Sequence, residues 1–189
     1  LQLIASRVFK QLFMRKRKPH IIPQLGEPLI PPGSSSAVFN GFVTSSANKQ
    51  GLQLKIYHEK NSGVACAWLT AKPFEGYPNT LHGGISFAIL DELLAYAVFA
   101  KFKTFAVTLS CKTQFFSRIR INEKIKANAV VTGRFWKFIR VEGHIYNSRG
   151  RAAVRMKSIF YVPTKKEFKK MMDLSVMPAE ALPYCGTEQ

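Results

Sequence analysis

One segment, residues 83–100 (GGISFAILDELLAYAVFA), limits the possible folds of this chain more than any other. Its pattern predicts an α-helix that is apolar on almost every side. Between residues 85 and 100 the apolar surface is interrupted only by Ser86, Asp91, Glu92 and Tyr96. A helix of this kind must be enclosed by the rest of the protein, so the other elements have to wrap around it.

The segments on both sides of this helix have the patterns of β-strands. Residues 52–58 alternate apolar with polar side chains, and residues 63–71 are apolar and β-prone after an Asn-Ser-Gly turn. Four further strands are expected at 105–116, 123–134, 138–147 and 151–162. The side chains expected to face the helix are Ile125, Ala127, Ala129 and Val131 in one strand and Ala152, Val154 and Met156 in another. This order predicts an α+β fold in which an antiparallel sheet wraps round one long central helix.

Two extensions flank this domain, which we place at residues 39–163. Residues 1–38 form a basic arm followed by a linker rich in proline, glycine and serine, and residues 164–189 form a C-terminal extension. In the arm, apolar residues recur at helical spacing: Leu1, Ile4, Val8 and Leu12. This arm resembles a mitochondrial targeting or post-targeting segment, and it also suits a basic arm that docks on a partner. Because the first residue is not methionine, we expect a processed or incomplete chain, and we expect no membrane span.

The charge is strongly basic, with 28 Lys and Arg against 11 Asp and Glu, a net of +17. Residues 1–37 hold six basic side chains and one acid, and the tail after Pro163 holds four of each. A net of +12 therefore belongs to the folded domain, and a basic fold implies an anionic partner. Coenzyme A phosphates would account for part of this charge, and nucleic acid would account for more of it. The three widely spaced cysteines fit a reducing compartment and form no metal-binding pattern.

The stretch at residues 76–97, GYPNTLHGGISFAILDELLAYA, carries a specific motif. It resembles the active-site loop and helix of PaaI-type hotdog thioesterases, which read GYPG-x-x-HGG-x-x-x-x-LLDE. Residues 108–116 resemble the third strand of that family, and residues 160–163 resemble its closing segment. The resemblance implies a hotdog fold that hydrolyses an acyl-CoA thioester, with no cofactor apart from the coenzyme A of the substrate and no metal.

The start of the helix supports this chemistry on physical grounds. Glycines there let a substrate approach free backbone N–H groups, and the helix dipole favours a developing negative charge. We therefore expect the Gly83 and Gly84 amides to polarise the thioester, and His82 to orient the loop or the substrate. The resemblance implies that Asp91 is the base or nucleophile and that Thr108 helps to position water.

Three further residues are expected to contact the substrate: Asn79, Glu92 and Phe87. Many relatives have an asparagine six residues before the histidine, where it holds the thioester carbonyl. This chain has Gly76 at that position, and Asn79 is the nearest amide.

The helical spacing also predicts an oligomer. Nine residues of helix separate His82 from Asp91 by about 13 Å, so the two cannot act on one substrate within one chain. Two helices that cross about a two-fold axis would bring them together. We therefore expect a homodimer or a dimer with a related hotdog chain.

A second motif, GRFWKFIR at residues 133–140, places aromatic and basic side chains at a predicted hairpin tip. The candidate nucleic-acid contacts are Arg134, Trp136, Lys137 and Arg140. A tryptophan that simply packs on the sheet edge explains the motif equally well. The main hypothesis is thus an acyl-CoA thioesterase of the mitochondrial matrix. The alternatives are a non-catalytic hotdog protein that contacts RNA in the mitochondrial ribosome or another large mitochondrial assembly, and an acyl-binding subunit without turnover.

Overall fold

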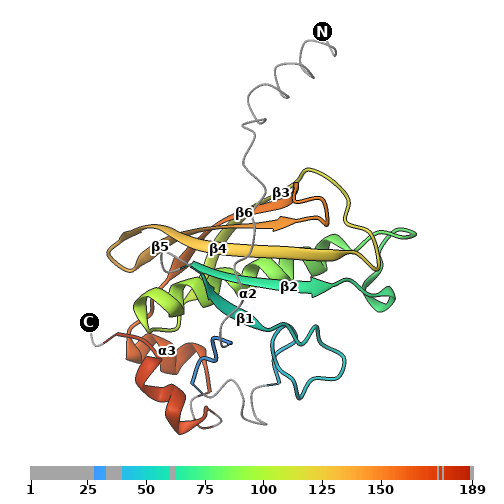
Figure 1. Cartoon of the computed structure of the whole chain (residues 1–189). Coiled ribbons are helices and arrows are strands. Elements are labelled where there is room, and N and C mark those ends of the chain that lie inside the picture. The colour runs from blue at the N-terminus through green and yellow to red at the C-terminus, as the bar shows by residue number, and fades with distance from the viewer. Residues whose placement is uncertain (1–27, 33–39, 60–62, 174, 176, 188–189) are drawn as a thin grey trace.

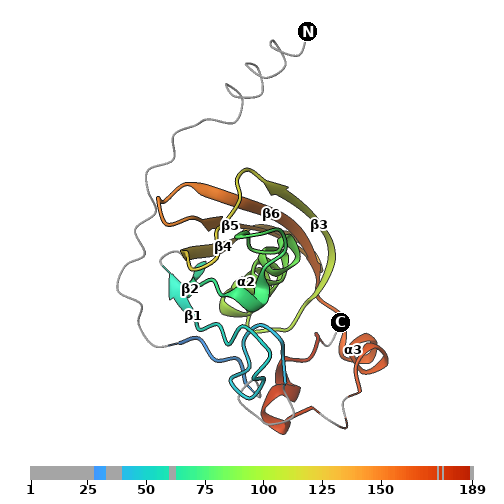
Figure 2. The same ribbon diagram turned by 90° about the vertical axis from the view of Figure 1, so that its right-hand side faces the viewer.

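The computed structural model describes residues 28–32, 40–59, 63–173, 175 and 177–187 (Figure 1). Its centre is a six-stranded antiparallel sheet in the order β1-β2-β4-β5-β6-β3. The strands are β1 (Ile56–Glu59), β2 (Gly63–Leu69), β3 (Val107–Phe115), β4 (Lys124–Phe135), β5 (Phe138–Tyr146) and β6 (Ala152–Tyr161). Figure 2 shows the sheet curled around one long helix, α2 (Gly83–Phe102). The predicted fold is confirmed.

Helix α2 is buried because the concave face of the sheet encloses it. Leu90, Leu93 and Leu94 are completely buried against the sheet. Close packing depends on Gly143 in β5, where a Cβ atom would lie 3.0 Å from the Asn128 carbonyl oxygen and 3.2 Å from Leu90. By length and composition α2 is also apolar enough to cross a membrane, contrary to the expectation that no apolar run is that long. Because α2 lies inside the curled sheet, its apolar composition is that of a core helix.

The predicted strands agree with the structure except at two places. Strand β1 begins at Ile56, because the N–H groups of Leu52 and Leu54 donate instead to the loop carbonyls of Phe42 and Val43. In β6 a bulge opposite Tyr146 adds one residue to the strand. Consequently Ala153 is fully buried and Ala152 only half-buried, whereas Val154 and Met156 face the helix as predicted.

The C-terminal extension packs on the end of α2. It contains a short helix, α3 (Lys165–Met171), and a 3₁₀ turn, η4 (Ala179–Tyr184). The Phe105 N–H donates to the Tyr184 carbonyl at 2.9 Å, and the rings of Phe99, Phe105 and Tyr184 form one cluster. The predicted helical arm at residues 1–18 lies outside the described residues, as does most of the linker.

Candidate active site

The loop before α2 places His82 through backbone hydrogen bonds. The His82 N–H donates to the carbonyl of Phe74 in a short 3₁₀ turn, η2 (Lys72–Phe74), at 2.9 Å. The preceding N–H, of Leu81, donates to the Ile119 carbonyl at 2.9 Å. Gly76 folds against the histidine so tightly that a Cβ atom would lie 3.0 Å from His82 Cδ2. Glycine at this position, where many relatives have asparagine, therefore allows the loop to close on His82.

The imidazole of His82 caps the helix. Its Nδ1 accepts a hydrogen bond from the Gly84 N–H at 2.9 Å. A nitrogen that accepts carries no proton, so the neutral ring holds its proton on Nε2 and can donate it to a substrate.

This cap corrects the expected role of Gly84, because its amide is already occupied. The next two amides, of Ile85 and Ser86, both donate to the His82 carbonyl. The Gly83 N–H is therefore the amide of the first turn that has no acceptor among the described residues. A Cβ on Gly84 would lie 3.0 Å from His82 Nδ1, so this glycine makes room for the ring.

The helix start is open to solvent. His82, Gly83 and Gly84 are exposed, and a depression of about 350 Å³ is lined by Gly76, Tyr77, Thr80, Leu81, His82 and Gly83. The ring of Phe115 in β3 lies beside Gly83, 3.6 Å from where a Cβ would stand. Phe87 is one turn further along the helix and 36% exposed. The residues at positions 83, 87 and 91 follow one side of the helix, so Phe87 lies on the line from Gly83 to Asp91.

Asp91 is paired with Thr108 across the space between α2 and β3. The Thr108 hydroxyl donates to Asp91 Oδ1 at 2.8 Å. Asp91 is half-buried and Thr108 is exposed, so both remain accessible to water and to a substrate.

The neighbouring carboxylate, Glu92, points to a different part of the chain. It accepts a hydrogen bond from the Thr44 hydroxyl at 2.9 Å. Burial raises the pKa of Glu92, and the charge of Asp91 adds to the rise, although the bond from Thr44 opposes it. The structure therefore does not place Glu92 beside the Asp91–Thr108 pair, and its predicted contact with substrate stays a prediction.

The start of α2 and the Asp91 carboxylate are too far apart within one chain to contact the same group. His82 caps α2 and Asp91 lies nine residues further along the chain, which corresponds to about 13 Å along the helix axis. Strand β3, which carries Thr108 and Phe115, is an edge strand whose one neighbour in the described sheet is β6. Each half of the site thus lies next to an open edge of the sheet.

Comparison with known proteins agrees with this arrangement. Residues 78–154 match the sequence model of the thioesterase superfamily. This segment, from the loop before α2 into β6, is therefore similar to that superfamily. No curated protein sequence matches it significantly.

Solved structures share the fold of this hotdog domain at low sequence identity. The PaaI protein of the E. coli phenylacetic acid degradation operon is 17% identical, with a TM-score of 0.55, over 58% of this chain and 83% of that protein. A hypothetical thioesterase from Streptococcus pneumoniae TIGR4, crystallised with coenzyme A, is 15% identical, with a TM-score of 0.54, over 57% of this chain and 86% of that protein. Thioesterase superfamily member 2 from Mus musculus is 15% identical, with a TM-score of 0.54, over 58% of this chain and 83% of that protein.

Two basic side chains of the hairpin at residues 133–140 contact other groups within the chain. Arg134 lies over the Phe102 ring at 4.8 Å and donates to the Trp136 carbonyl. Lys137 is only 12% exposed, lies over the Trp136 ring at 5.0 Å and is 3.8 Å from Glu167. Trp136 contacts the Phe138 ring but is 67% exposed. Lys137 is therefore largely occupied within the chain, whereas Arg134, Trp136 and Arg140 are exposed.

Several residues of the site were not identified from sequence. Phe74 and Ile119 contribute only backbone carbonyls to the His82 loop, which no side-chain pattern reveals. Asn79 stands at an exposed turn with a left-handed φ of 53°, and its N–H donates to the Glu75 carboxylate. Asparagine tolerates that conformation, which gives it a turn role beside its predicted substrate contact.

Proposed function

We propose that this hotdog domain hydrolyses an acyl-CoA thioester to a carboxylic acid and coenzyme A. The observation that carries the proposal is the Thr108–Asp91 hydrogen bond on the inner side of the sheet. It aligns a carboxylate for proton transfer, while the capped helix start offers donors for an oxyanion. The PaaI and S. pneumoniae structures that share the fold support the substrate class, since the second was crystallised with coenzyme A.

The reaction then follows from the placement of the donors. The thioester oxygen accepts hydrogen bonds from the Gly83 N–H and from His82 Nε2–H. Asp91 takes a proton from water, the hydroxide adds to the carbonyl carbon, and the developing negative charge moves to the oxygen between those two donors. When the carbonyl re-forms, the C–S bond breaks and the thiolate of coenzyme A leaves and is protonated. Thr108 keeps the Asp91 carboxylate oriented, and no metal or further cofactor takes part in the proposed reaction.

The proposed catalyst is a homodimer or a dimer with a related hotdog chain. The separation of His82 and Asp91 within one chain requires the second half of the site to come from another subunit. The exposed edge at β3 supports this arrangement, since Leu109, Phe115 and Phe116 are 59%, 57% and 47% exposed there. Two β3 strands pairing antiparallel about a two-fold axis would cover these side chains. One subunit would then supply Gly83 and the other Asp91.

The test uses the purified full-length chain and a panel of acyl-CoA thioesters, with release of the free thiol as the readout. We expect turnover by the wild type and a loss of at least a hundredfold in kcat for Asp91→Asn, in line with removal of a general base. The matched control is Asp173→Asn in the C-terminal extension, where the aspartate accepts hydrogen bonds from Ser175. A wild type that hydrolyses no member of the panel, or an Asp91→Asn variant as fast as the control, contradicts the proposal.

The RNA-contacting alternative is favoured by two observations, the net charge of +12 over residues 38–163 and the exposed Trp136. It would use Arg134, Trp136 and Arg140, which are exposed, rather than Lys137, which is 12% exposed and 3.8 Å from Glu167. An inactive wild type that sediments with ribosomal RNA, and is released from it by salt, would support this function over hydrolysis.

The mitochondrial matrix is the compartment proposed for either function, on the composition of residues 1–18. Import of a fusion of residues 1–38 to a reporter protein tests it. A reporter that stays outside the organelle would contradict this location.

A further inference from the structure

The end of the molecule opposite the start of α2 combines basic side chains with two exposed aromatic rings. The turn between β4 and β5 lies there, together with the last residues of α2 and the helix α3 (Figure 1). Arg134 in β4 lies over the ring of Phe102, the last residue of α2, at 4.8 Å. Lys137 in the turn is 3.8 Å from Glu167 in α3. The three segments are therefore in contact, and we call them the basic-aromatic end: residues 101–103, 133–140 and 165–171.

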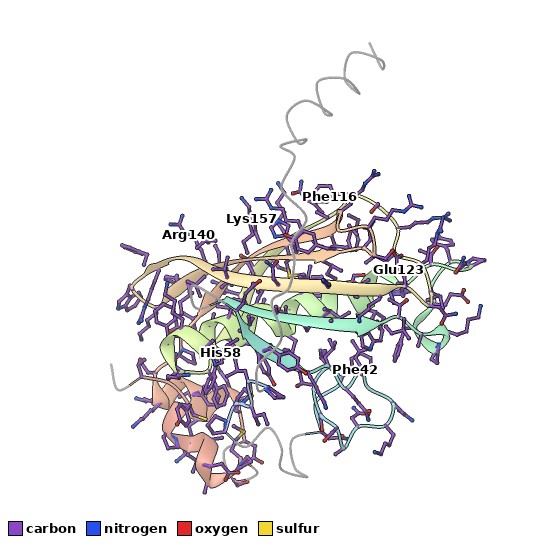
Figure 3. All side chains as sticks on the ribbon, in the orientation of Figure 1. Phe42, His58, Phe116, Glu123, Arg140 and Lys157 are labelled. Atoms are coloured by element: carbon purple, nitrogen blue, oxygen red, sulfur yellow. The ribbon has the colours of Figure 1, made fainter. Side chains whose placement is uncertain are left out.

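The basic-aromatic end has a large excess of positive charge. Its three segments contain nine basic residues and one acid, Glu167, and all nine except Lys137 are exposed. Glu167 already accepts hydrogen bonds from the hydroxyls of Tyr161 and Thr164. In Figure 3 the labelled Arg140 lies toward this end, and Glu123 lies at the opposite end. A surface with this charge attracts an anionic partner.

Two large aromatic side chains are exposed at the turn between β4 and β5. Phe135 is 79% exposed and Trp136 is 67% exposed. The backbone of Trp136 is also left-handed, with a φ of 52°, which is the conformation that hairpin turns usually give to asparagine or glycine. A bulky side chain in this conformation makes the turn less stable, and strain of this kind is typical of functional positions.

We propose that the basic-aromatic end docks on a membrane surface that contains anionic lipids. Phe135 and Trp136 enter the headgroup region, where amphipathic aromatic rings are favoured. The surrounding lysines and arginines bind the lipid phosphates. Insertion of apolar side chains and attraction of charge act together in such attachment. This inference goes beyond the proposed hydrolysis and does not depend on it.

The arrangement of the rings favours lipid over RNA as the partner. A base stacks on an open ring face. Here Lys137 Nζ lies over one face of the Trp136 ring at 5.0 Å, and the ring of Phe138 contacts it at a centroid distance of 6.1 Å. Phe135 has no polar group that could bond a base edge. An apolar ring beside an indole, with Arg134 drawn back over Phe102, suits the boundary between headgroups and acyl chains.

Docking at this end leaves the candidate active site open to solution. Helix α2 extends from Gly83 to Phe102, about 30 Å along its axis, and therefore holds its first residues away from the bilayer. Loss of membrane binding should then leave the rate on an acyl-CoA in solution unchanged. Membrane binding and hydrolysis can thus be measured separately on the same variants.

The first experiment measures co-sedimentation of the full-length chain with vesicles of equal parts phosphatidylcholine and phosphatidylglycerol. The variant is Phe135→Ser/Trp136→Asn. The matched control is Leu69→Ser, which removes an exposed leucine that pairs with Lys124 at the start of β4. We expect the variant to bind at least about tenfold more weakly and the control to bind like the wild type. The basic arm at residues 1–18 is present in all three proteins, so the difference reports on the turn.

Two further measurements separate lost docking from lost folding. Salt, or replacement of the phosphatidylglycerol by phosphatidylcholine, should weaken binding of the wild type. The single variant Trp136→Asn should bind vesicles more weakly while its free energy of unfolding stays the same or rises, because asparagine tolerates a φ of 52°.

The second experiment locates the Trp136 ring by fluorescence. The chain has two tryptophans, and the other, Trp68, is half-buried with its ring centroid 5.5 Å from that of Phe74. In Trp68→Phe the emission comes from Trp136 alone. We expect this emission to shift to the blue on vesicles and to be quenched by lipids that carry bromine on their acyl chains.

Three results would overturn the membrane surface. Equal vesicle binding by the variant and the control would show that the turn takes no part. Emission of Trp136 that brominated lipids leave unquenched would show that its ring stays outside the bilayer. Saturable binding of ribosomal RNA that the variant loses, with no binding to vesicles, would assign this end to RNA. Turn-dependent vesicle binding by a chain that hydrolyses no acyl-CoA would support the membrane surface and refute only the proposed hydrolysis.

Discussion

Replacing Thr108 by valine tests the central contact of the candidate site. Valine keeps the shape of threonine but has no hydroxyl, so the bond to Asp91 Oδ1 at 2.8 Å is lost. A hydrogen bond to a charged group contributes about 1.5–3 kcal/mol. Because Thr108 is exposed, water replaces part of the bond, and the lower end of this range applies. About 1.5 kcal/mol corresponds to roughly a tenfold loss of rate.

The assay is steady-state hydrolysis of an acyl-CoA at saturating substrate. We expect kcat to fall roughly tenfold in Thr108→Val, KM to stay the same, and Thr108→Ser to retain most of the rate because it keeps the hydroxyl. The free energy of unfolding should change by less than about 0.5 kcal/mol, as for other exposed substitutions.

A double-mutant cycle decides whether Thr108 acts through Asp91. If it does, adding Thr108→Val to Asp91→Asn causes no further loss of rate. Equal rates for the valine and serine variants, or fully additive losses in the cycle, would refute this role for the hydroxyl.

Three other perturbations test the fold, the assembly and the C-terminal extension. Gly143→Val places side-chain atoms against Leu90 and should lower the free energy of unfolding by about 1–3 kcal/mol in urea titration, whereas Gly41→Val, where a Cβ would meet nothing within 4 Å, should not. Leu109→Asp, on the open edge of β3, should give a monomer by light scattering and abolish turnover; a dimeric variant would contradict the proposed pairing. Hydrogen bonds from Thr164 and Tyr161 lower the pKa of Glu167 from 4.5 to about 2. The stability that these bonds give to the folded state is therefore complete above pH 4.5 and is lost as the pH falls through 2. Hydrogen exchange of residues 165–171 should accelerate over that interval, and Glu167→Gln should remove the pH dependence.

Some features of the candidate site follow from neighbouring residues in the sequence, and others depend on contacts between residues that are distant in the chain. The histidine, the glycines and the aspartate were identified from one contiguous stretch, because a helix start and a buried helix leave clear local patterns. The family resemblance implied a role for Asp91 and for Thr108, but their hydrogen bond to each other was not predicted. Nothing local to either residue encodes a hydrogen bond between positions 17 residues apart.

The different roles of Gly83 and Gly84 could not be predicted from the local sequence either. Both have the same sequence context, yet the His82 ring accepts the Gly84 N–H, and the Gly83 N–H has no acceptor among the described residues. A side-chain rotamer makes this choice, and a rotamer depends on packing against Gly76 and the η2 turn.

The contacts of Glu92 and of the basic hairpin within the chain were not predicted from the sequence, for a related reason. A carboxylate in an apolar helix indicates a partner but not its direction, and here the partner is Thr44, in a loop 48 residues away. Arg134 and Lys137 belong to a basic, aromatic stretch, but their partners Phe102 and Glu167 come from two other elements. Composition measures how much charge a segment has, and tertiary contacts decide how much of it remains for a partner.

The sequence by itself therefore determined the architecture. A helix apolar on nearly every side, flanked by segments of period two, has few ways to be buried other than inside a curled antiparallel sheet. Only the tertiary structure decided which amide of the first turn has no acceptor among the described residues and which hydroxyl bonds the Asp91 carboxylate. These depend on strand register and loop closure, which bring together residues that are distant in the chain.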